Sequence, residues 1–153
     1  MMDLTQMDLS GKSEGVCVFC GIVDGRTECM KVFEDDLCVA FLDDKPLFPG
    51  HVLLVPRTHV DSFDDVTETI ASRLFSAARL LSKAVQLGLG AEGTFIAVNN
   101  RVSQSVPHLH VHVVPRNRGD GLRGFFWPRR KYGDGEAASV QAAIRSALEK
   151  LQS

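Results

Sequence analysis

Three of the five histidines in this 153-residue chain lie within five residues, as His108, His110 and His112. A neutral imidazole can act as a nucleophile or as a proton donor near physiological pH, so such a row is suited to catalysis. Alternate residues of a β-strand point to the same side, and the spacing therefore predicts a strand that shows three imidazoles on one face. The other face is expected to lie in the core and holds Leu109, Val111 and Val113.

A single metal ion is a poor match for three ligands on one straight strand. At a rise of about 3.3 Å per residue, the Cα atoms of His108 and His112 would lie about 13 Å apart. A tetrahedral zinc ion holds nitrogen ligands at about 2.0–2.1 Å. The spacing therefore favours separate roles for the three rings, and a hydrolase that uses them as zinc ligands is an alternative from another class.

Neutral hydrogen-bond donors precede the histidines, at Asn99, Asn100, Gln104 and Ser105. Amide and hydroxyl groups suit a phosphoryl transition state, which gathers negative charge on oxygen. No carboxylate occurs in residues 96–119, so this segment would not repel a phosphate. The sequence has no Gly-x-Ser-x-Gly elbow and no glycine-rich phosphate-binding motif. A phosphate site would therefore have to be built from the histidine segment itself.

The composition is that of one domain with a hydrophobic core, since 44% of the residues are apolar and 24% are charged. The net charge of −2 gives no general reason to expect a nucleic-acid or membrane partner. No segment reads as a signal peptide or approaches the roughly 18 apolar residues of a transmembrane helix. We therefore expect a cytoplasmic protein, with a flexible segment over residues 1–15 and a single domain over residues 16–153. In that compartment the four cysteines are thiols or metal ligands rather than disulfides.

The order of the expected elements predicts an α+β fold with an antiparallel sheet. Residues 17–23 are expected to form a short helical or extended segment. Before the histidine strand, the pattern predicts strands over residues 32–34, 38–42, 51–55 and 94–98. A loop rich in arginine, glycine and aromatic residues follows the histidine strand over residues 115–135.

Two main helices are expected. Apolar residues at spacings of three and four over residues 70–85 predict a long helix. Asp65 and Glu68 resemble a capping box at its start, and Gly88 is its expected C-terminal cap. A second apolar stripe over residues 140–151 predicts a C-terminal helix.

The segment from Gln104 to Val114 resembles the histidine triad motif, His-x-His-x-His followed by two apolar residues. Three further stretches are similar to the same family in the same order, over residues 17–23, 33–43 and 49–59. On these motifs the chain is identified as a member of the histidine triad (HIT) superfamily, and it looks most like the bacterial-type branch, which includes diadenosine polyphosphate hydrolases. The resemblance implies a five-stranded antiparallel sheet with two main helices, and a homodimer that joins two such sheets edge to edge.

The resemblance also implies roles for the polar residues. His110 matches the family's nucleophile, which attacks the α-phosphorus of a nucleotide and forms a covalent nucleotidyl-histidine intermediate. His112 matches a residue that hydrogen-bonds phosphate oxygens, and His51 matches a histidine beside the triad. Gln104 and Ser105 match positions that contact the phosphate or the leaving group.

Six other residues match the family's nucleotide site. Asp43 matches the carboxylate that accepts hydrogen bonds from the two ribose hydroxyls, and Asn99 matches a polar residue of the site. The apolar base pocket is matched by Phe19, Ile22, Phe41 and Leu53. By composition alone these four are core residues and Asp43 is a turn residue at the end of a strand.

Cys17 and Cys20 form a Cys-x-x-Cys pair, which is a common half-site for zinc and otherwise two inert thiols. In zinc-containing members of the family, the two remaining ligands match His59 and His108. The resemblance thus implies a structural zinc ion with four protein ligands, and it gives His108 a role apart from the nucleophile.

Ser103 departs from the family pattern, because it stands where the family usually has a glycine. The loop over residues 116–132 is basic and aromatic, and it could hold a long leaving group, a second base or a dimer partner. We therefore expect a hydrolase or transferase of dinucleoside polyphosphates. The alternatives are a purine nucleoside phosphoramidase and a protein that binds nucleotides without turnover. No nucleic-acid partner is expected, since the extra zinc finger of the related DNA-repair deadenylases is absent.

Overall fold

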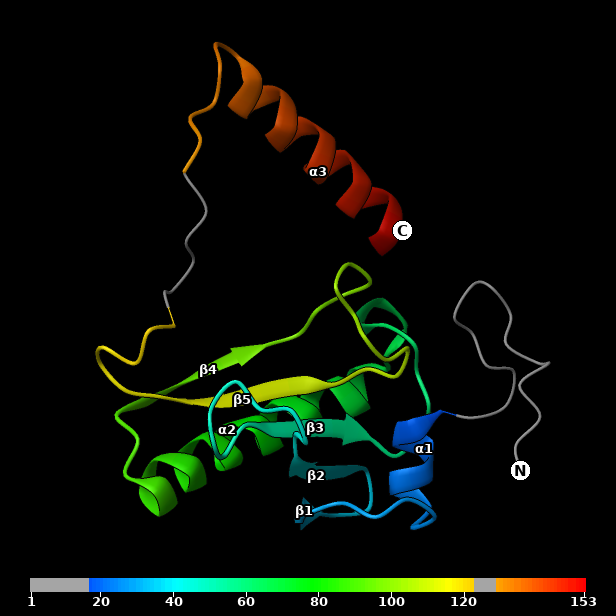
Figure 1. Cartoon of the computed structure of the whole chain (residues 1–153). Helices are drawn as coiled ribbons and strands as arrows, with labels where there is room; N and C mark the ends of the chain where they lie inside the picture. Colours follow the sequence, from blue (N-terminus) through cyan, green and yellow to red (C-terminus); the bar gives the residue numbers. More distant parts are fainter. Residues whose placement is uncertain (1–16, 123–128) are drawn as a thin grey trace, which may run out of the picture. The chain divides into compact units, whose positions relative to one another are not determined.

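The computed structural model describes residues 17–122 and 129–153 (Figure 1). They belong to two compact units, one up to Asp120 and one from Gly121 to Ser153. The first unit holds, in order, α1 (Val18–Val23), β1 (Lys31–Glu34), β2 (Cys38–Leu42), β3 (Val52–Pro56), the 3₁₀ turn η2 (Phe63–Asp65), α2 (Glu68–Leu89), β4 (Gly93–Ala97) and β5 (Val111–Arg116). The second unit holds α3 (Glu136–Gln152). The segment expected to be flexible, residues 1–15, lies outside the described residues, and the single domain over residues 16–153 stays a prediction.

The five strands form one sheet in the order β1-β2-β3-β5-β4, and every neighbouring pair is antiparallel. Strands β1, β2 and β3 follow one another across the sheet, and the long helix α2 then carries the chain to the edge strand β4 (Figure 1). Strand β5 returns between β3 and β4. The predicted α+β fold with a five-stranded antiparallel sheet is therefore confirmed, and the homodimer stays a prediction.

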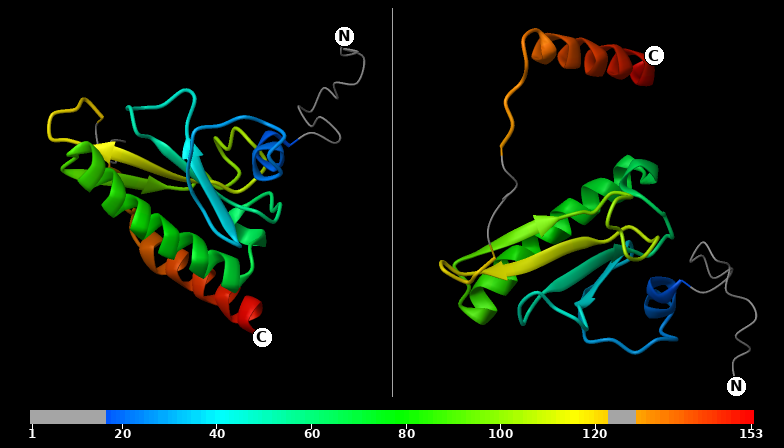
Figure 2. Two further views of the ribbon diagram at one scale, coloured as in Figure 1. Left: turned by 90° about the horizontal axis from the view of Figure 1, so that it is seen from below. Right: turned by 45° about the horizontal axis from the view of Figure 1, so that its top comes forward.

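The two faces of the sheet carry different helices (Figure 2). Helix α2 covers one face, where its apolar stripe packs against alternate residues of the strands, including Leu54, Val111 and Val113. The other face carries α1, whose buried residues pack with Phe41, Leu53 and Val55. Because α1 has only six residues, it covers a small part of its face, and the candidate site lies there.

One row of residues crosses the sheet on the α1 face. Phe41 of β2 lies opposite Leu53 of β3, Leu53 lies opposite His112 of β5, and His112 lies opposite Ala97 of β4. Directly opposite residues project to the same side of a sheet. The register therefore holds His112 directly beside Leu53, with Phe41 one strand further along the same row; the sequence assigns both apolar residues to a base pocket.

The prediction of one strand that carries all three histidines is wrong. Strand β5 begins at Val111, so it contains His112 but neither His108 nor His110. The alternation rule applies only to extended strands, and the chain before Val111 is not paired in the sheet. The three rings are consequently not held on one face by strand geometry.

A tight turn at Pro107 explains where the strand begins. The backbone N–H of His108 donates to the carbonyl of Val106 at 2.8 Å, which closes a three-residue turn around the proline. The fixed φ and the missing N–H of proline suit the centre of such a turn. The next N–H, that of Leu109, donates to the carbonyl of Val60 at 2.8 Å, and the Leu109 side chain lies in the core as predicted.

Helix α2 forms as predicted, but its caps differ from the prediction. The N-cap is Thr67, whose hydroxyl accepts the backbone N–H of Ile70 at 3.3 Å. The carboxylate of Asp65 is instead engaged within the preceding turn. The C-terminal cap is Gly90, in the left-handed conformation with φ 65°, rather than Gly88. The helix therefore runs past Gly88, its second-to-last residue, and ends at Leu89.

Helix α3 is the predicted C-terminal helix. It begins after Gly135, which has a left-handed φ of 73°, and none of its residues is buried. The large residues of its apolar stripe are all exposed: Val140, Ile144, Leu148 and Leu151. No helix within the two described ranges is long and apolar enough to cross a membrane. The cytoplasmic location stays a prediction.

Candidate functional site

A cavity of about 760 Å³ opens on the α1 face of the sheet. This volume lies in the range of about 300–1,000 Å³ that is typical of small-molecule sites. Five of the six residues assigned to nucleotide binding line it: Phe19, Ile22, Phe41, Leu53 and Asp43. The rest of the lining comes from α1, from the chain around the end of β2 and from the chain before β1: Val18, Thr27, Glu28, Cys29, Met30, Leu42 and Asp44. The structure thus brings the apolar residues and Asp43 together in one cavity.

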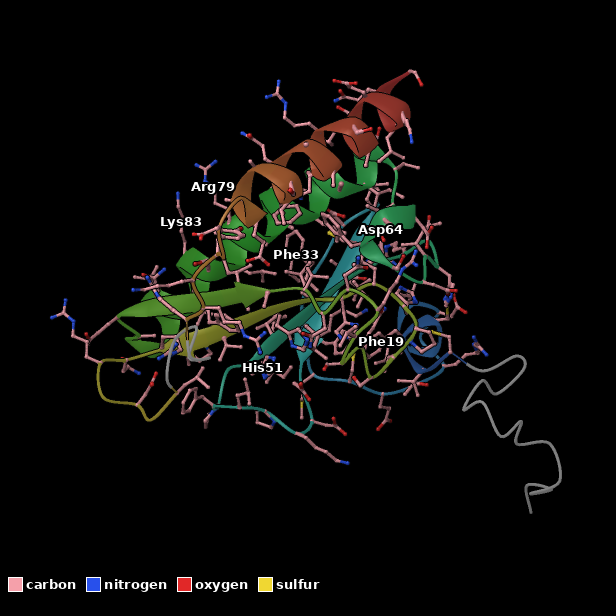
Figure 3. All side chains as sticks on the ribbon, turned by 90° about the horizontal axis from the view of Figure 1, so that it is seen from above. Phe19, Phe33, His51, Asp64, Arg79 and Lys83 are labelled. Carbon is pink, nitrogen blue, oxygen red and sulfur yellow. The ribbon has the colours of Figure 1, made fainter. Side chains whose placement is uncertain are left out.

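Aromatic contacts join the cavity to the histidines. The ring of Phe19, on α1, lies 5.5 Å from the ring of Phe41 and 5.2 Å from the ring of His110, both edge to face. Edge-to-face contacts are favourable because the positive edge of one ring meets the negative face of the other. Figure 3 shows Phe19 and His51 on the side of the sheet away from α2. His110 therefore lies directly behind a wall of the cavity.

The main chain fixes the ring of His110, which is 4% exposed. Its Nδ1 lies 2.8 Å from the carbonyl oxygen of His108. A carbonyl can only accept a hydrogen bond, so this nitrogen carries the proton. In the neutral ring, Nε2 then keeps its lone pair. The arrangement prepares Nε2 of His110 to act as a nucleophile.

A chain of hydrogen bonds fixes the proton of His112. The backbone N–H of Leu47 donates to Nδ1 of His51 at 3.1 Å, so the proton of His51 is on Nε2. That Nε2 donates to Nδ1 of His112 at 2.9 Å, so the proton of His112 is on its own Nε2. This Nε2 is buried and has no hydrogen-bond partner among the described residues. Since an unpaired buried donor is costly, the atom is suited to an oxygen of a bound ligand.

Burial keeps these two rings neutral. It lowers the pKa of His112 to about 4, with further lowering by the charges of His110 and His51. Burial also lowers the pKa of His51, although the carboxylate of Asp43, 3.7 Å from its Nδ1, acts in the opposite direction. Both rings therefore carry no charge near pH 7. His112 binds an oxygen by donating a hydrogen bond rather than as a cation.

Asp43, His51 and His112 also bring three potential metal-ligand atoms within 4.8 Å of one another. The facing nitrogens are already engaged, because His51 accepts the N–H of Leu47 and donates to His112. Asp43 also accepts the backbone N–H of Lys45 at 2.9 Å. A metal ion bound here would have to break these hydrogen bonds, which have normal lengths. The geometry thus disfavours a zinc hydrolase that uses these histidines as ligands.

A second group of ligand atoms consists of all four predicted metal residues, Cys17, Cys20, His59 and His108, with their atoms within 4.8 Å of one another. Nδ1 of His108 lies 3.4 Å from Sγ of Cys17 and 3.6 Å from Sγ of Cys20. Nδ1 of His59 lies 3.2 Å from Sγ of Cys20. A tetrahedral zinc ion with bonds of about 2.0–2.3 Å separates its ligand atoms by about 3.3–3.8 Å. The four side chains therefore fit such an ion.

Outer hydrogen bonds turn both imidazoles of this group toward the thiols. Nε2 of His108 donates to the carbonyl of Pro56 at 2.9 Å, and Nε2 of His59 donates to the carboxylate of Asp61 at 2.7 Å. Such bonds set the tautomer and orientation of metal-binding histidines. Burial and the neighbouring Cys17 raise the pKa of the Cys20 thiol to about 11. Two thiolates at this place therefore need a cation between them.

The loop between β4 and β5 carries the other predicted residues, Asn99, Gln104 and Ser105. None of the three is among the residues that line the cavity. Asn99 and Ser105 are exposed. The side-chain amide of Gln104 donates to the carbonyls of Asp61 and Val106. The amide of Gln104 is thus engaged within the protein.

Ser103 keeps the backbone conformation that a glycine would favour. Its φ is 61°, in the left-handed region, and Arg101 in the same loop has φ 68°. A residue with a Cβ adopts this conformation at a cost of about 1–2 kcal/mol. The loop therefore keeps the same backbone path at Ser103, and the serine adopts it with local backbone strain.

The basic loop over residues 116–132 is described in part, since residues 123–128 lie outside the described ranges. Arg116 pairs with the carboxylate of Asp120 at 2.6 Å. Arg118 lies 3.5 Å from the carboxylate of Glu92. Both arginines are therefore next to carboxylates, which reduces the positive charge that this part of the loop can offer to an anion.

Three features of the site were missed by the sequence analysis. Asp61 orients His59. The sequence pattern that could have identified it is a carboxylate two residues after a candidate metal ligand. Leu47 acts through its backbone N–H, so no residue type marks it. The cavity wall over residues 27–30 is irregular chain, and irregular chain has no periodic pattern to find.

Comparisons with known proteins agree with this geometry. Residues 24–119 match the HIT domain. The chain is 37% identical to an uncharacterized HIT-like protein of Saccharolobus solfataricus, over 89% of this chain and 100% of that protein. It is 34% identical to the adenylylsulfatase HINT3 of Arabidopsis thaliana, over 88% of this chain and 71% of that protein. It is 29% identical to the adenosine 5'-monophosphoramidase hnt1 of Schizosaccharomyces pombe, over 87% of this chain and 98% of that protein.

Solved structures show the same fold. A HIT family protein from Bacillus anthracis superimposes with a TM-score of 0.78 at 31% identity, covering 87% of this chain and 97% of that chain. A zinc-bound histidine triad family protein from Mycobacterium smegmatis gives a TM-score of 0.67 at 33% identity, covering 88% of this chain and 96% of that chain. The five-stranded sheet, the histidine motif and these matches together show that the chain belongs to the histidine triad (HIT) family.

Proposed function

We propose that the protein is a nucleotide hydrolase or nucleotidyltransferase that acts at the α-phosphorus of nucleoside 5'-phosphoryl compounds. The observation that carries the proposal is a pair of ring nitrogens beside a nucleotide-sized cavity. His110 presents a lone pair on Nε2, and His112 presents a buried N–H on Nε2, with the rings 5.0 Å apart. A nucleophile next to a donor for developing negative charge suits phosphoryl transfer.

In the first step, the lone pair on Nε2 of His110 attacks the α-phosphorus. A P–N bond forms while the bond to the leaving group breaks, and the leaving group departs with that electron pair and takes a proton from solvent water. The ring of His110 gains positive charge, which the carbonyl of His108 stabilises through Nδ1–H. The N–H of His112 donates to a phosphate oxygen, where negative charge develops.

In the second step, the oxygen of a water molecule attacks the phosphorus. The P–N bond breaks, its electron pair returns to Nε2 of His110, and the attacking water releases one proton to the solvent. A nucleoside monophosphate leaves and the neutral ring is restored. An acceptor other than water would make the same intermediate a step of nucleotidyl transfer.

We assign Ser105, at the loop before the triad, to contact with the phosphate or leaving group.

The cavity supports the assignment of the nucleoside. Asp43 lies at its polar end, 3.7 Å from His51, so a ribose bound to this carboxylate would bring its 5'-phosphate toward the histidines. The base is assigned to the apolar walls formed by Phe19, Ile22, Phe41 and Leu53. Asn99 is assigned to the polar side of the site, and His51 to positioning His112.

We assign a structural zinc ion to Cys17, Cys20, His59 and His108. The compact set of two sulfur and two nitrogen ligands supports this assignment, as does the zinc-bound relative from Mycobacterium smegmatis. Four protein ligands leave no open position for substrate, which is typical of structural zinc. When bound, the ion would supply a fixed anchor for the ring of His108.

For the leaving group, we rank small groups above long polyphosphates. The preference for dinucleoside polyphosphates depended on the basic loop, in which Arg116 and Arg118 lie next to carboxylates. One relative is named an adenylylsulfatase and another an adenosine 5'-monophosphoramidase. We therefore place adenosine 5'-phosphoramidate and adenylyl sulfate first and diadenosine polyphosphates second.

Rapid mixing with adenosine 5'-phosphoramidate, acid-free quenching and mass spectrometry would test the chemistry. We expect an adduct of the mass of a nucleoside monophosphate on His110, and no adduct in His110→Ala. His112→Ala is the matched control, because it keeps the nucleophile and should form the same adduct more slowly. Full turnover by His110→Ala would exclude the proposed mechanism.

Turnover rates on the three substrates would test the ranking. We expect kcat/KM to be higher for the phosphoramidate and for adenylyl sulfate than for diadenosine tetraphosphate. A higher kcat/KM for diadenosine tetraphosphate than for the other two substrates would instead favour dinucleoside polyphosphates as the preferred substrates. Tight binding of nucleotides with no turnover of any of the three would instead favour the non-catalytic alternative.

A further inference from the structure

We propose that Gln104 is a positioning residue that joins the catalytic loop to the metal-ligand group, rather than a contact to the substrate phosphate. This inference rests on the function proposed above and concerns the same site. The amide nitrogen of Gln104 donates to the carbonyls of Asp61 and Val106, the latter at 3.2 Å, and its amide oxygen accepts the backbone N–H of Arg101 at 3.0 Å.

The amide of Gln104 has no proton left for a phosphate. A side-chain amide has two N–H donors, and two carbonyls accept them. The orientation is fixed by its partners, because a flipped amide would turn N–H groups toward the N–H of Arg101 and oxygen toward two carbonyls. A hydrogen bond to a phosphate oxygen would therefore require breaking one of the bonds that hold the loop.

Asp61 connects Gln104 to the metal-ligand group. Its carbonyl accepts from Gln104, and its carboxylate accepts from Nε2 of His59 at 2.7 Å. The bond from Asp61 turns Nδ1 of His59 toward Sγ of Cys20 at 3.2 Å. One residue thus takes part in both the loop anchor and the orientation of a metal ligand.

The connection returns to the catalytic loop through His108. Sγ of Cys20 lies 3.6 Å from Nδ1 of His108. The backbone N–H of His108 donates to the carbonyl of Val106, which is the second acceptor of Gln104. The contacts therefore form a closed ring in which the amide of Gln104 bridges two carbonyls. The same His108 supplies the carbonyl that accepts from His110.

A second set of contacts fixes the loop to the same segment. The side-chain amide of Asn100 accepts the backbone N–H of Phe63 at 3.1 Å and donates to Asp64 at 3.2 Å. Arg101 lies 3.4 Å from the carboxylate of Asp64, which is labelled on η2 in Figure 3. The loop before the triad is thus held by residues 61–64 at several points. Of these contacts, only those of Gln104 reach the residue that orients a metal ligand.

Gln104 should affect both the retention of the metal ion and the orientation of the nucleophile, which a contact to the phosphate alone would not link. Loss of its N–H groups should loosen His59 through Asp61 and should loosen His108 through Val106. Metal retention and the orientation of the nucleophile should then decline together. A residue that only contacted the substrate would change the binding of substrate and leave the metal-ligand group as it is.

The test compares Gln104→Glu and Gln104→Met with the wild-type protein loaded with zinc. Glutamate keeps the shape and the acceptor but removes both donors, while methionine keeps the length without charge or hydrogen bonds. Gln86→Glu is the matched control, since Gln86 also donates its amide to a main-chain carbonyl, that of Ser82 on α2. The measurements are zinc release to a chromogenic chelator, hydrogen exchange of the His108 and Leu109 amides, and the separate values of kcat and KM.

We expect zinc release from both Gln104 variants to be faster by up to about 10-fold, because loss of a direct outer-shell partner costs about 10–100-fold and Gln104 acts one contact further out, through Asp61. Exchange of the His108 and Leu109 amides should be faster, and kcat should fall while KM stays nearly constant. Gln86→Glu should match the wild type in all three. A raised KM with unchanged zinc release and unchanged exchange would overturn the proposal. If the wild type turned over no nucleotide, the proposed function would fail, but amide hydrogen exchange and zinc release would still decide this inference. In protein that holds no zinc, hydrogen exchange of the two amides would decide it alone.

Discussion

Nε2 of His51 donates a hydrogen bond to Nδ1 of His112 across 2.9 Å, and this bond decides which nitrogen of His112 carries its proton. The Leu47 N–H makes the direction of the bond unambiguous, because it occupies the other nitrogen of His51. His112 is consequently left with a buried donor directed away from His51. His51 acts on the reaction through a tautomer rather than by contact with substrate.

Removing the nitrogens of His51 should therefore slow the reaction. In His51→Phe, Nδ1 of His112 has no donor and can take the proton itself, so Nε2 loses its N–H. We expect kcat to fall by about 10²–10³-fold, as for the loss of one donor to a developing oxyanion. Steady-state kinetics on adenosine 5'-phosphoramidate would measure this fall. His51→Gln, which can retain an N–H donor, should lose less, and equal activity of His51→Phe and wild type would contradict the assignment.

The buried His112 should make the protein sensitive to mild acid. Its pKa is about 4 in the folded protein, against 6.5 without burial. The unfolded chain therefore binds a proton more readily, so the contribution of His112 to stability is complete above pH 6.5 and is lost as the pH falls toward 4. The lowered pKa values of His51 and His108 act in the same direction.

Urea unfolding at pH steps from 7 to 4 would measure this loss. We expect the free energy of unfolding of His112→Gln to fall less steeply than that of the wild type, by at most about 1.4 kcal/mol per pH unit. Asp35, whose pKa is held at about 2 by its hydrogen bonds from backbone N–H groups and Arg73, loses its contribution below this window. Identical slopes in the two proteins would show that His112 is not the titrating group.

Glycine at position 103 should stabilise the protein. Ser103 has a φ of 61°, and glycine adopts this region without the clash of a Cβ. Part of the gain is offset by the greater freedom of glycine in the unfolded chain, so we expect Ser103→Gly to raise the free energy of unfolding by about 0.5–1 kcal/mol. Ser72→Gly, at an exposed position of α2, should lower it by a similar amount. Denaturant midpoints of the two variants should therefore move in opposite directions.

Zinc should bind with a stoichiometry of one ion per chain and should stabilise the fold. At a free concentration of 100 times its Kd, the ion adds about 2.7 kcal/mol to the free energy of unfolding. Chelation should therefore lower the melting temperature. Cys17→Ser should lose the bound ion, while Cys29→Ser should keep it, because Cys29 is not among the four clustered ligands. Metal analysis of the purified variants would check both expectations.

Replacing Gly50 by a residue with a Cβ should lower the free energy of unfolding. Its φ is 95°, and a Cβ at this position would overlap Cδ1 of Leu89. We expect Gly50→Ala to cost about 1–2 kcal/mol from backbone strain, because the exposed side chain of Leu89 can turn away from the new methyl group. Gly88→Ala is the control, since a Cβ there meets nothing within 4 Å and alanine favours a helix by about 0.5–1 kcal/mol. Thermal melts that rank the two variants in the opposite order would contradict this reading.

The core and the strands of this protein could be predicted because they follow periodic patterns. The stripe over residues 70–85 places Leu74 and Leu81 in the core as expected. The register that brings His112 beside Leu53 could not be predicted, because pairing depends on contacts between distant strands. The caps of α2 were misassigned because Asp65 and Thr67 are both good N-caps, and only the structure shows which one bonds to the helix.

The site was more difficult to predict from physical reasoning about residues alone. The alternation rule placed His108 and His110 on a strand, but a tight turn centred on Pro107 precedes them and strand β5 begins only at Val111. The separate role of His108 came from the motif, and the structure places its ring against both thiols. The serine at position 103 does not itself indicate a left-handed backbone, since serine rarely adopts it; only the glycine that the family usually has at this position points to it.

The carbonyl oxygen of His108 accepts a hydrogen bond from Nδ1–H of His110. This acceptor is a main-chain atom, so replacing the side chain at position 108 does not delete it. A scan of alanine substitutions would record His108 only as a metal ligand and would miss its part in setting the nucleophile. His108→Ala therefore separates the two contributions, because it deletes the ring and retains the carbonyl. The hydrogen bond that places the proton on Nδ1 of His110 is therefore retained whichever side chain stands at position 108.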